Sequence, residues 1–210
     1  MIVLDIETSG LNPVDSGICE IGAIDLYNPN NIFFQECRVD DEDLIQDEAL
    51  AVNGKTAEGI RDKNNQSQKQ LLINFFKWCD SVKIKNCICQ NPQFDFGFIF
   101  QKARKYSLFL PINFRCFDMH SIAQVKYSDI NGKFLINEKG NSGMNLTEVL
   151  KFVGMVDNRK DHNALEDVKL TAECFYRIIY GKNLFSEFEV FFIPDYLKKD
   201  SDSMSKDDKL

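Results

Sequence analysis

Apolar and polar residues alternate along the first 40 residues of the chain, where Val, Ile and Phe recur between turn-forming Gly, Asn and Pro. This pattern predicts three strands, at residues 2–7, 18–26 and 32–39. The segments between them, residues 9–17 and 28–31, are rich in turn formers. Because short turns join antiparallel neighbours, we expect these strands to form a meander.

Further along the chain the periodicity becomes helical and then alternates with short apolar runs. Helices are predicted at residues 42–52, 67–81, 92–106, 118–126, 145–153 and 164–179, and two further strands at residues 84–89 and 114–117. Asn53-Gly54 is a stop signal for the first helix, and the polar segment 128–143 predicts a surface loop. A meander followed by alternating strands and helices predicts an α/β fold with a mixed five-stranded sheet flanked by helices.

The carboxyl-terminal part of the chain differs in composition from the rest. Residues 1–181 are predicted to form the main domain. Residues 182–197 are an aromatic extension that we expect to dock, as an extra strand or helix, on this domain or on a partner. Residues 198–210 are charged and serine-rich with little to bury, which predicts a disordered tail.

Composition is that of a globular protein with an acidic surface. Of the 210 residues, 44% are hydrophobic and 18 are Phe, enough for one domain with a sizeable core. The chain carries 32 acidic and 25 basic side chains, for a net charge of -7. This balance disfavours binding to an extended nucleic-acid duplex. A nucleic-acid enzyme of this charge would have to bind a short or single-stranded end and rely on metal ions to offset the charge of the phosphates.

No apolar run is long enough to cross a bilayer, and the amino terminus lacks the charged region of a signal peptide. We therefore expect a soluble, cytoplasmic protein without a membrane partner. The seven Cys residues are scattered and odd in number. Buried, reduced thiols are the expected state of such cysteines.

Two carboxylates, Asp5 and Glu7, stand at the end of the first predicted strand, just before Ser9-Gly10. Residues two apart on a strand share a face, so Val3, Asp5 and Glu7 should project together. Adjacent like charges repel, and a divalent cation is an economical way to offset that cost. The pair alone leaves open the alternative of a strand end that runs into a solvated acidic turn.

A second acid, Asp95, lies among phenylalanines in the segment that follows the strand at residues 84–89. Asn91 is a suitable N-cap and Pro92 suits the first helical position, so a helix is predicted to begin here. Asp95 then falls in the first turns of this helix. Either a favourable charge near the positive helix terminus or a metal-binding role accounts for an acid at this position.

The third candidate is the segment from Asp161 to Asp167. Asn163 and Glu166 form a capping-box pattern, which makes Asn163 the N-cap of the last long helix. His162 and Asp167 then occupy the two positions whose side chains meet across a helix entrance, where packing normally favours two apolar groups. An imidazole and a carboxylate at these positions indicate chemistry, although a lone His is more often structural.

These motifs, taken in order, resemble a known family. The three segments are Asp5-x-Glu7-Thr8, Phe94-Asp95-x-x-Phe98-Ile99 and His162-x4-Asp167. They are similar to the three exonuclease motifs of the DEDDh family, the DnaQ-like 3'-5' exonucleases with a ribonuclease H-like fold. The resemblance covers residues 1–179, and the histidine subclass fits better than its tyrosine-bearing sister group because His162 stands at the distinguishing position.

The resemblance implies a site and a cofactor. Asp5, Glu7, Asp95 and Asp167 would gather around two Mg²⁺ or Mn²⁺ ions. One ion would orient and acidify the attacking water, and the other would stabilise the leaving 3' oxygen. His162 would be the general base, since an imidazole with a pKa near about 6.5 accepts a proton at neutral pH.

The same resemblance implies that Thr8, Gly10 and Leu11 hold the terminal nucleotide, with Leu11 available to stack on a base. An ordinary turn residue is the slightly preferred alternative for Leu11. Asn53 belongs with these substrate-binding residues but replaces a histidine that family members often carry before the Gly. Asp118, where family members often have an acid, is interpreted as a helix cap.

Two functional hypotheses follow. The first is a metal-dependent 3'-5' exonuclease that releases nucleoside monophosphates from single-stranded DNA or RNA ends or short oligonucleotides. The second is a non-catalytic module of the same fold that binds nucleic acid or a polymerase. Four acids and a histidine favour the enzyme, because a pure binder has no need to hold so much like charge together. A polymerase partner and a homodimer both stay open.

Overall fold

The computed structural model describes residues 1–199, which form two compact units. Unit 1 consists of Met1–Met119 and Asn158–Ala172, and unit 2 consists of His120–Asp157 and the chain from Glu173 onward. Residues 200–210, which make up most of the predicted disordered tail, lie outside the described residues. None of the helices within residues 1–199 has both the length and the apolar composition needed to cross a membrane.

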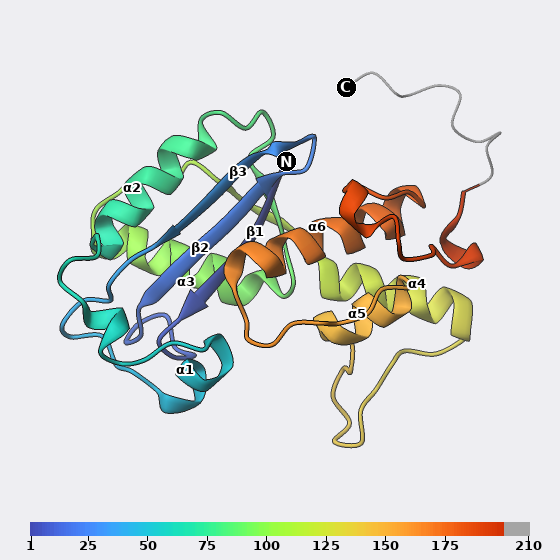
Figure 1. Ribbon diagram of the computed structural model, residues 1–210, viewed down its shortest axis with the longest axis horizontal. Helices are drawn as coiled ribbons and strands as arrows, with labels where there is room; N and C mark the ends of the chain where they lie inside the picture. The colour runs from blue at the N-terminus through green and yellow to red at the C-terminus, as the bar shows by residue number, and fades with distance from the viewer. Residues whose placement is uncertain (200–210) are drawn as a thin grey trace. The chain divides into compact units, whose positions relative to one another are not determined.

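Unit 1 is built on a mixed five-stranded sheet (Figure 1). The strands are β1 (Ile2–Thr8), β2 (Ile18–Asp25), β3 (Asn28–Glu36), β4 (Asn86–Cys89) and β5 (Asn113–Asp118). Their order is β3-β2-β1-β4-β5, with antiparallel pairing among the first three and parallel pairing of β4 to both β1 and β5. The predicted meander and the predicted mixed sheet are confirmed.

The turn between β2 and β3 is shorter than predicted. Residues 28–31, predicted as a turn, belong to β3, and the chain reverses at Leu26 and Tyr27. Asp25 makes this possible, because its Oδ1 accepts hydrogen bonds from the Tyr27 amide (3.2 Å) and from the amino-terminal ammonium of Met1 (2.9 Å). An aspartate that bonds the backbone two residues on mimics a turn.

The helices of unit 1 are α1 (Asp47–Asn53), α2 (Gln68–Cys79), α3 (Pro92–Lys105) and the first part of α6 (Ala164–Tyr180), with a short 3-10 helix at Gly59–Arg61. Gly54 ends α1 in the left-handed conformation (φ 65°), as its stop signal predicts. The start predicted at residue 42 is wrong. Asp43 in that stretch instead forms a buried ion pair with Lys102 of α3, with Oδ1 2.8 Å from Nζ.

The core of unit 1 lies on one face of the sheet. Ile2, Leu4 and Ile6 of β1 pack with Phe75 of α2 and Phe98 of α3 in one buried cluster. Figure 1 shows α2 and α3 alongside the strands that supply this face. Alternation along β1 therefore buries its even-numbered residues here and turns Asp5 and Glu7 to the opposite face.

Unit 2 contains α4 (Met119–Asn131) except for its first residue, α5 (Leu146–Phe152) and the second part of α6. It also contains two 3-10 helices, at Ser186–Phe188 and Asp195–Leu197. The helix α4 runs five residues beyond its predicted end at 126, so residues 128–131 of the predicted loop are helical. The loop after α4 is held by Gln124 of that helix. The Gln124 side chain accepts a hydrogen bond from the Leu135 amide (3.0 Å) and donates one to the Leu135 carbonyl (2.8 Å).

A buried ion pair on α6 fixes the aromatic segment within unit 2. The guanidinium of Arg177 donates to Glu173 Oε1 (2.8 Å), and both side chains are fully buried. Arg177 also donates to backbone carbonyls of Val153, Phe188 and Phe191, and Glu173 accepts from the amides of Leu184 and Phe185. Each half of the pair thus anchors turns of the extension. None of the seven cysteines, all of which lie within residues 1–199, forms a disulfide, and six are buried, in agreement with the prediction.

Candidate active site

The two acids of β1 share the face of the sheet opposite the apolar core. In the β1–β2 ladder Asp5 lies opposite Gly22, and Glu7 lies opposite Glu20. Glu7 is 8% exposed, and the protein also covers most of the surface of Asp5. Paired residues of an antiparallel ladder point to the same side, so Gly22 and Glu20 are the immediate neighbours of the acidic pair.

Gly22 and Glu20 seat the beginning of α6. A Cβ atom on Gly22 would lie 2.2 Å from the carbonyl oxygen of Ala164, so only glycine lets the helix approach this closely. Glu20 Oε2 accepts a hydrogen bond from the Ala164 amide at 3.1 Å. Asn163 caps the helix, because its Oδ1 accepts from the amides of Leu165 (3.1 Å) and Glu166 (3.2 Å). The predicted cap at Asn163 is confirmed.

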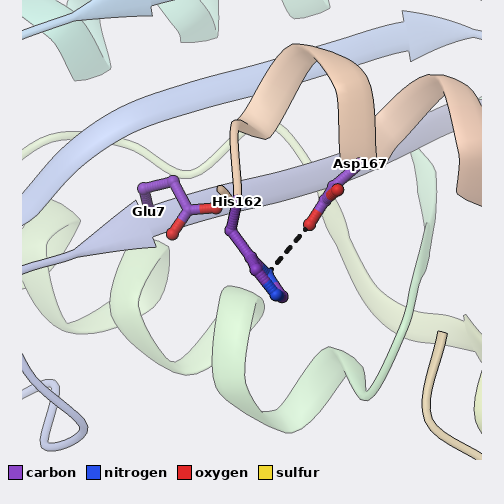
Figure 2. A group of neighbouring side chains, drawn as sticks. All are labelled: Glu7, His162 and Asp167. Carbon is purple, nitrogen blue, oxygen red and sulfur yellow. Dashed lines mark ion pairs between the residues drawn. The ribbon is translucent and has the colours of Figure 1, made fainter. Parts of the chain in front are cut away.

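These contacts of Gly22 and Glu20 place the beginning of α6 next to Glu7. Ligand atoms of Glu7, His162 and Asp167 all lie within 4.8 Å of one another, and Figure 2 shows the three side chains converging from β1 and from the start of α6. His162 Nδ1 lies 3.2 Å from Asp167 Oδ2. The imidazole is 47% exposed and the carboxylate 5% exposed, so the histidine is open to solvent while Asp167 is buried.

Asp95, in the first turn of α3, is bonded to β1 but is not one of the three side chains whose ligand atoms lie within 4.8 Å of one another. Its Oδ1 accepts a hydrogen bond from the amide of Ile6 at 3.1 Å, and Ile6 stands between Asp5 and Glu7 on β1. The turn before α3 differs from the prediction, because Asn91 adopts the left-handed conformation (φ 73°) and makes no side-chain cap. The Asn91 amide donates instead to Asp118 Oδ1 at 3.3 Å, so Asp118 ties the end of β5 to this turn.

Burial and neighbouring negative charges raise the pKa of Asp5, Glu7 and Asp95. Burial, followed by the negative charges of Asp95, Asp167 and Glu7, raises the pKa of Asp5 well above its usual range. Burial, with the charge of Asp167 adding to it, raises the pKa of Glu7 to about 7. Burial likewise raises the pKa of Asp95 to about 8, although backbone hydrogen bonds oppose the change.

Such a group of hard oxygen donors fits a divalent cation. Mutual repulsion among buried carboxylates is relieved when a doubly charged ion sits between them, and carboxylate oxygens are the donors that Mg²⁺ and Mn²⁺ prefer. The hydrogen bond to Asp167 raises the pKa of His162, which follows from the opposite charge beside the imidazole. Catalytic roles for these residues stay predictions.

Several residues of the site were not found from the sequence. The guanidinium of Arg159 lies 2.9 Å from Asp167 Oδ1, and Lys55 pairs with both Glu20 and Glu36. Arg159 belongs to the loop before α6, where no periodic pattern indicates which way a side chain points. Its position three residues before His162 is the one signal that the sequence offers.

Of the predicted substrate-binding residues, Thr8 ends β1, Gly10 and Leu11 lie in the turn that follows, and Asn53 ends α1. Thr8 Oγ1 donates to the Gly10 carbonyl at 2.7 Å, and Asn53 Nδ2 donates to the Thr8 carbonyl at 3.1 Å. Leu11 is held through its amide to Gln46 Oε1 (3.0 Å), and the residue is 73% exposed. Asn53 therefore stabilises the start of this turn through a hydrogen bond, while Leu11 is exposed to solvent. Contact of these residues with a nucleotide stays a prediction.

Comparison with known proteins gives a family match. The sequence model of the exonuclease family that includes RNase T matches residues 2–175. A curated relative, the PolC-type DNA polymerase III of Caldanaerobacter subterraneus subsp. tengcongensis, is 26% identical over 178 residues. The match covers 85% of this chain but only 11% of that much longer protein.

Solved structures share the fold at low sequence identity. E. coli exonuclease I, in complex with a dT13 oligonucleotide, superposes with a TM-score of 0.68 at 18% identity, over 84% of this chain and 40% of that one. The nuclease domain of 3'hExo, a DEDDh family member bound to rAMP, gives 0.63 at 17% identity, over 85% of this chain and 90% of that one. Cell-death related nuclease 4 gives 0.66 at 15% identity, over 85% and 62%.

Proposed function

We propose that this chain, which belongs to the DnaQ-like exonuclease family, hydrolyses phosphodiester bonds at single-stranded 3' ends and releases nucleoside monophosphates. The observation that carries the proposal is the convergence of Glu7, His162 and Asp167, whose ligand atoms lie within 4.8 Å of one another. Two short motifs that lie far apart in the sequence thus supply one compact group of chemically active side chains.

In this proposal Asp5, Glu7, Asp95 and Asp167 hold two Mg²⁺ or Mn²⁺ ions. Bound divalent cations supply Lewis-acid stabilisation of the charge that develops on the phosphoryl oxygens and make water a better nucleophile. The raised pKa values of Asp5, Glu7 and Asp95 support this assignment, because burial and the neighbouring negative charges both disfavour the ionised carboxylates, and a bound cation would offset that cost.

His162 is assigned the general base. Its Nδ1 faces Asp167 Oδ2 at 3.2 Å, so a neutral imidazole that donates from Nδ1 keeps Nε2 free to accept the proton of the attacking water. The imidazole is 47% exposed, so water reaches it without movement of the helix. Asp167 thereby holds both the tautomer and the orientation of the ring. General-base catalysis of this kind contributes about 10² to 10⁴ in rate.

The terminal nucleotide is assigned to the turn formed by Thr8, Gly10 and Leu11. The exposed side chain of Leu11 is available to stack on the last base, while Asn53 holds the turn through the Thr8 carbonyl. A net charge of -7 supports a short or single-stranded substrate rather than a long duplex. The related structure of exonuclease I holds a deoxyoligonucleotide and that of 3'hExo holds a ribonucleotide, so both DNA and RNA ends belong to the proposal.

One assay tests the proposal. The full chain is incubated with 5'-labelled and 3'-labelled single-stranded oligonucleotides in Mg²⁺, in Mn²⁺ and in EDTA. Wild-type protein should release labelled mononucleotide from the 3' label and shorten the 5'-labelled strand stepwise, in metal only. His162→Ala should be slower by about 10² or more, Asp167→Asn should be inactive, and Glu166→Gln, an exposed acid one residue away, should be unaffected.

A second candidate is a binding module without catalysis. The similarity to a region of a PolC-type DNA polymerase favours a polymerase or its nucleic acid as the partner. Metal-independent retention of the oligonucleotide with no shortened product would support this candidate and contradict the exonuclease. A second copy of the chain is the other partner to consider, and sedimentation of the full chain would detect it.

A further inference from the structure

The acidic site contains a positive charge that the proposed chemistry does not use. Arg159 Nη1 lies 2.9 Å from Asp167 Oδ1, and the two side chains are 7% and 5% exposed. A guanidinium does not lose its proton in a protein, so this charge is permanent at every pH at which the chain is folded. A buried and permanently charged guanidinium is therefore paired with Asp167, one of the four acids assigned to metal binding.

Both oxygens of Asp167 are engaged. Oδ1 faces Arg159 at 2.9 Å, and Oδ2 faces His162 at 3.2 Å. A metal ion that takes Asp167 as a ligand must share an oxygen with the guanidinium or displace it. A divalent cation brought this close to a guanidinium also repels it, and such repulsion is weakly screened in a buried site.

We infer that Arg159 is the resident counter-ion of the acidic site: it stabilises the metal-free protein and competes with the divalent cation for Asp167. The inference rests on the proposed metal binding and adds a residue that sets its affinity. Without the guanidinium, the buried carboxylate of Asp167 loses its permanently charged partner and keeps only His162, so the metal-free protein is destabilised. The metal-bound protein loses a repulsion instead, so the same substitution should strengthen cation binding.

The test is titration of Mn²⁺ into the full chain, followed by calorimetry and by melting temperature. For Arg159→Gln we expect the Mn²⁺ dissociation constant to fall about tenfold, the scale on which groups surrounding metal ligands act. Its melting temperature in EDTA should fall below that of wild type, and its rise on adding Mn²⁺ should be larger. Lys160→Gln removes the same charge from the exposed neighbouring residue and should change neither quantity.

The outcomes separate this inference from the proposed function. If wild type binds Mn²⁺ and Arg159→Gln binds it equally well or more weakly, the counter-ion role is wrong while the exonuclease proposal stands. If neither protein binds Mn²⁺, both fail. A variant that folds only with Mn²⁺ present supports the inference in its strongest form, and a variant that stays unfolded in saturating Mn²⁺ contradicts it.

Discussion

Replacing Gly22 by alanine tests whether the sheet surface positions the helix that carries His162 and Asp167. The added Cβ would lie 2.2 Å from the Ala164 carbonyl oxygen and 2.5 Å from its carbon, whereas real Cβ contacts essentially never fall below 3.0 Å. The start of α6 must therefore retreat by about 0.8 Å, because the obstacle is backbone and cannot rotate away. Overpacking of this kind costs about 1 to 3 kcal/mol.

The displaced helix should lower both the stability and the activity of the protein. For a chain of this size, about 1 to 3 kcal/mol corresponds to a fall in melting temperature of about 3 to 10 °C. A shift of about 1 Å in positioned catalytic groups costs about 10²-fold in rate. We expect Gly22→Ala to fold, to melt lower within that range, and to degrade a 5'-labelled single-stranded oligonucleotide about 10² times more slowly in Mn²⁺.

Gly97→Ala is the matched control. Gly97 lies within α3, and a Cβ there would meet only Pro13 Cγ at 4.0 Å, an ordinary contact. Alanine in a helix interior is favoured over glycine by about 1 kcal/mol, so this variant should be as stable as wild type or more so and should remain active. Unchanged activity in Gly22→Ala, or equal losses in both variants, would refute the claim that Gly22 seats α6.

Three further predictions concern charge. In EDTA the melting temperature should fall as the pH rises from 5 to 8. Burial raises the pKa of Glu7 to about 7, so the folded protein binds more protons than the unfolded chain in that window and loses stability as they dissociate. Mn²⁺ should restore stability more at pH 8 than at pH 5, and a flat or rising profile in EDTA would contradict the raised pKa of Glu7. Arg177→Met leaves Glu173 buried without its partner and should lower the free energy of unfolding in urea by about 3 to 5 kcal/mol; a loss under about 1 kcal/mol would show that the pair does not anchor the extension. Lys102→Met should destabilise unit 1 by a similar amount, about 3 to 5 kcal/mol, because Asp43 stays buried, and combining it with Asp43→Asn should recover much of the loss in the same urea titration.

Much of the fold follows from local patterns in the sequence. The alternation at residues 2–7 marks β1, because Ile2, Leu4 and Ile6 share one apolar face, and the apolar residues within 18–26 mark β2. Gly54 and Asn163 mark helix ends because their chemistry suits a left-handed residue and an N-cap. The spacing of His162 and Asp167 depends only on helix geometry, so their meeting also follows from the sequence.

Features that depend on contacts between distant segments could not be predicted in the same way. The need for glycine at position 22 arises from Ala164, which is far away in the chain. Asp43 belongs to an acidic stretch that looks like the start of a helix, and only the partner Lys102 reveals its burial. Arg159 lies in a loop, where side-chain direction has no sequence period.

The central claim is that the carboxylates of β1, α3 and α6 hold divalent cations. Crystals of the full chain grown with Mn²⁺ test it directly, through the anomalous signal of the metal. The account predicts anomalous peaks in contact with the oxygens of Asp5, Glu7, Asp95 and Asp167. Well-ordered crystals in saturating Mn²⁺ that show no peak among these side chains would contradict it.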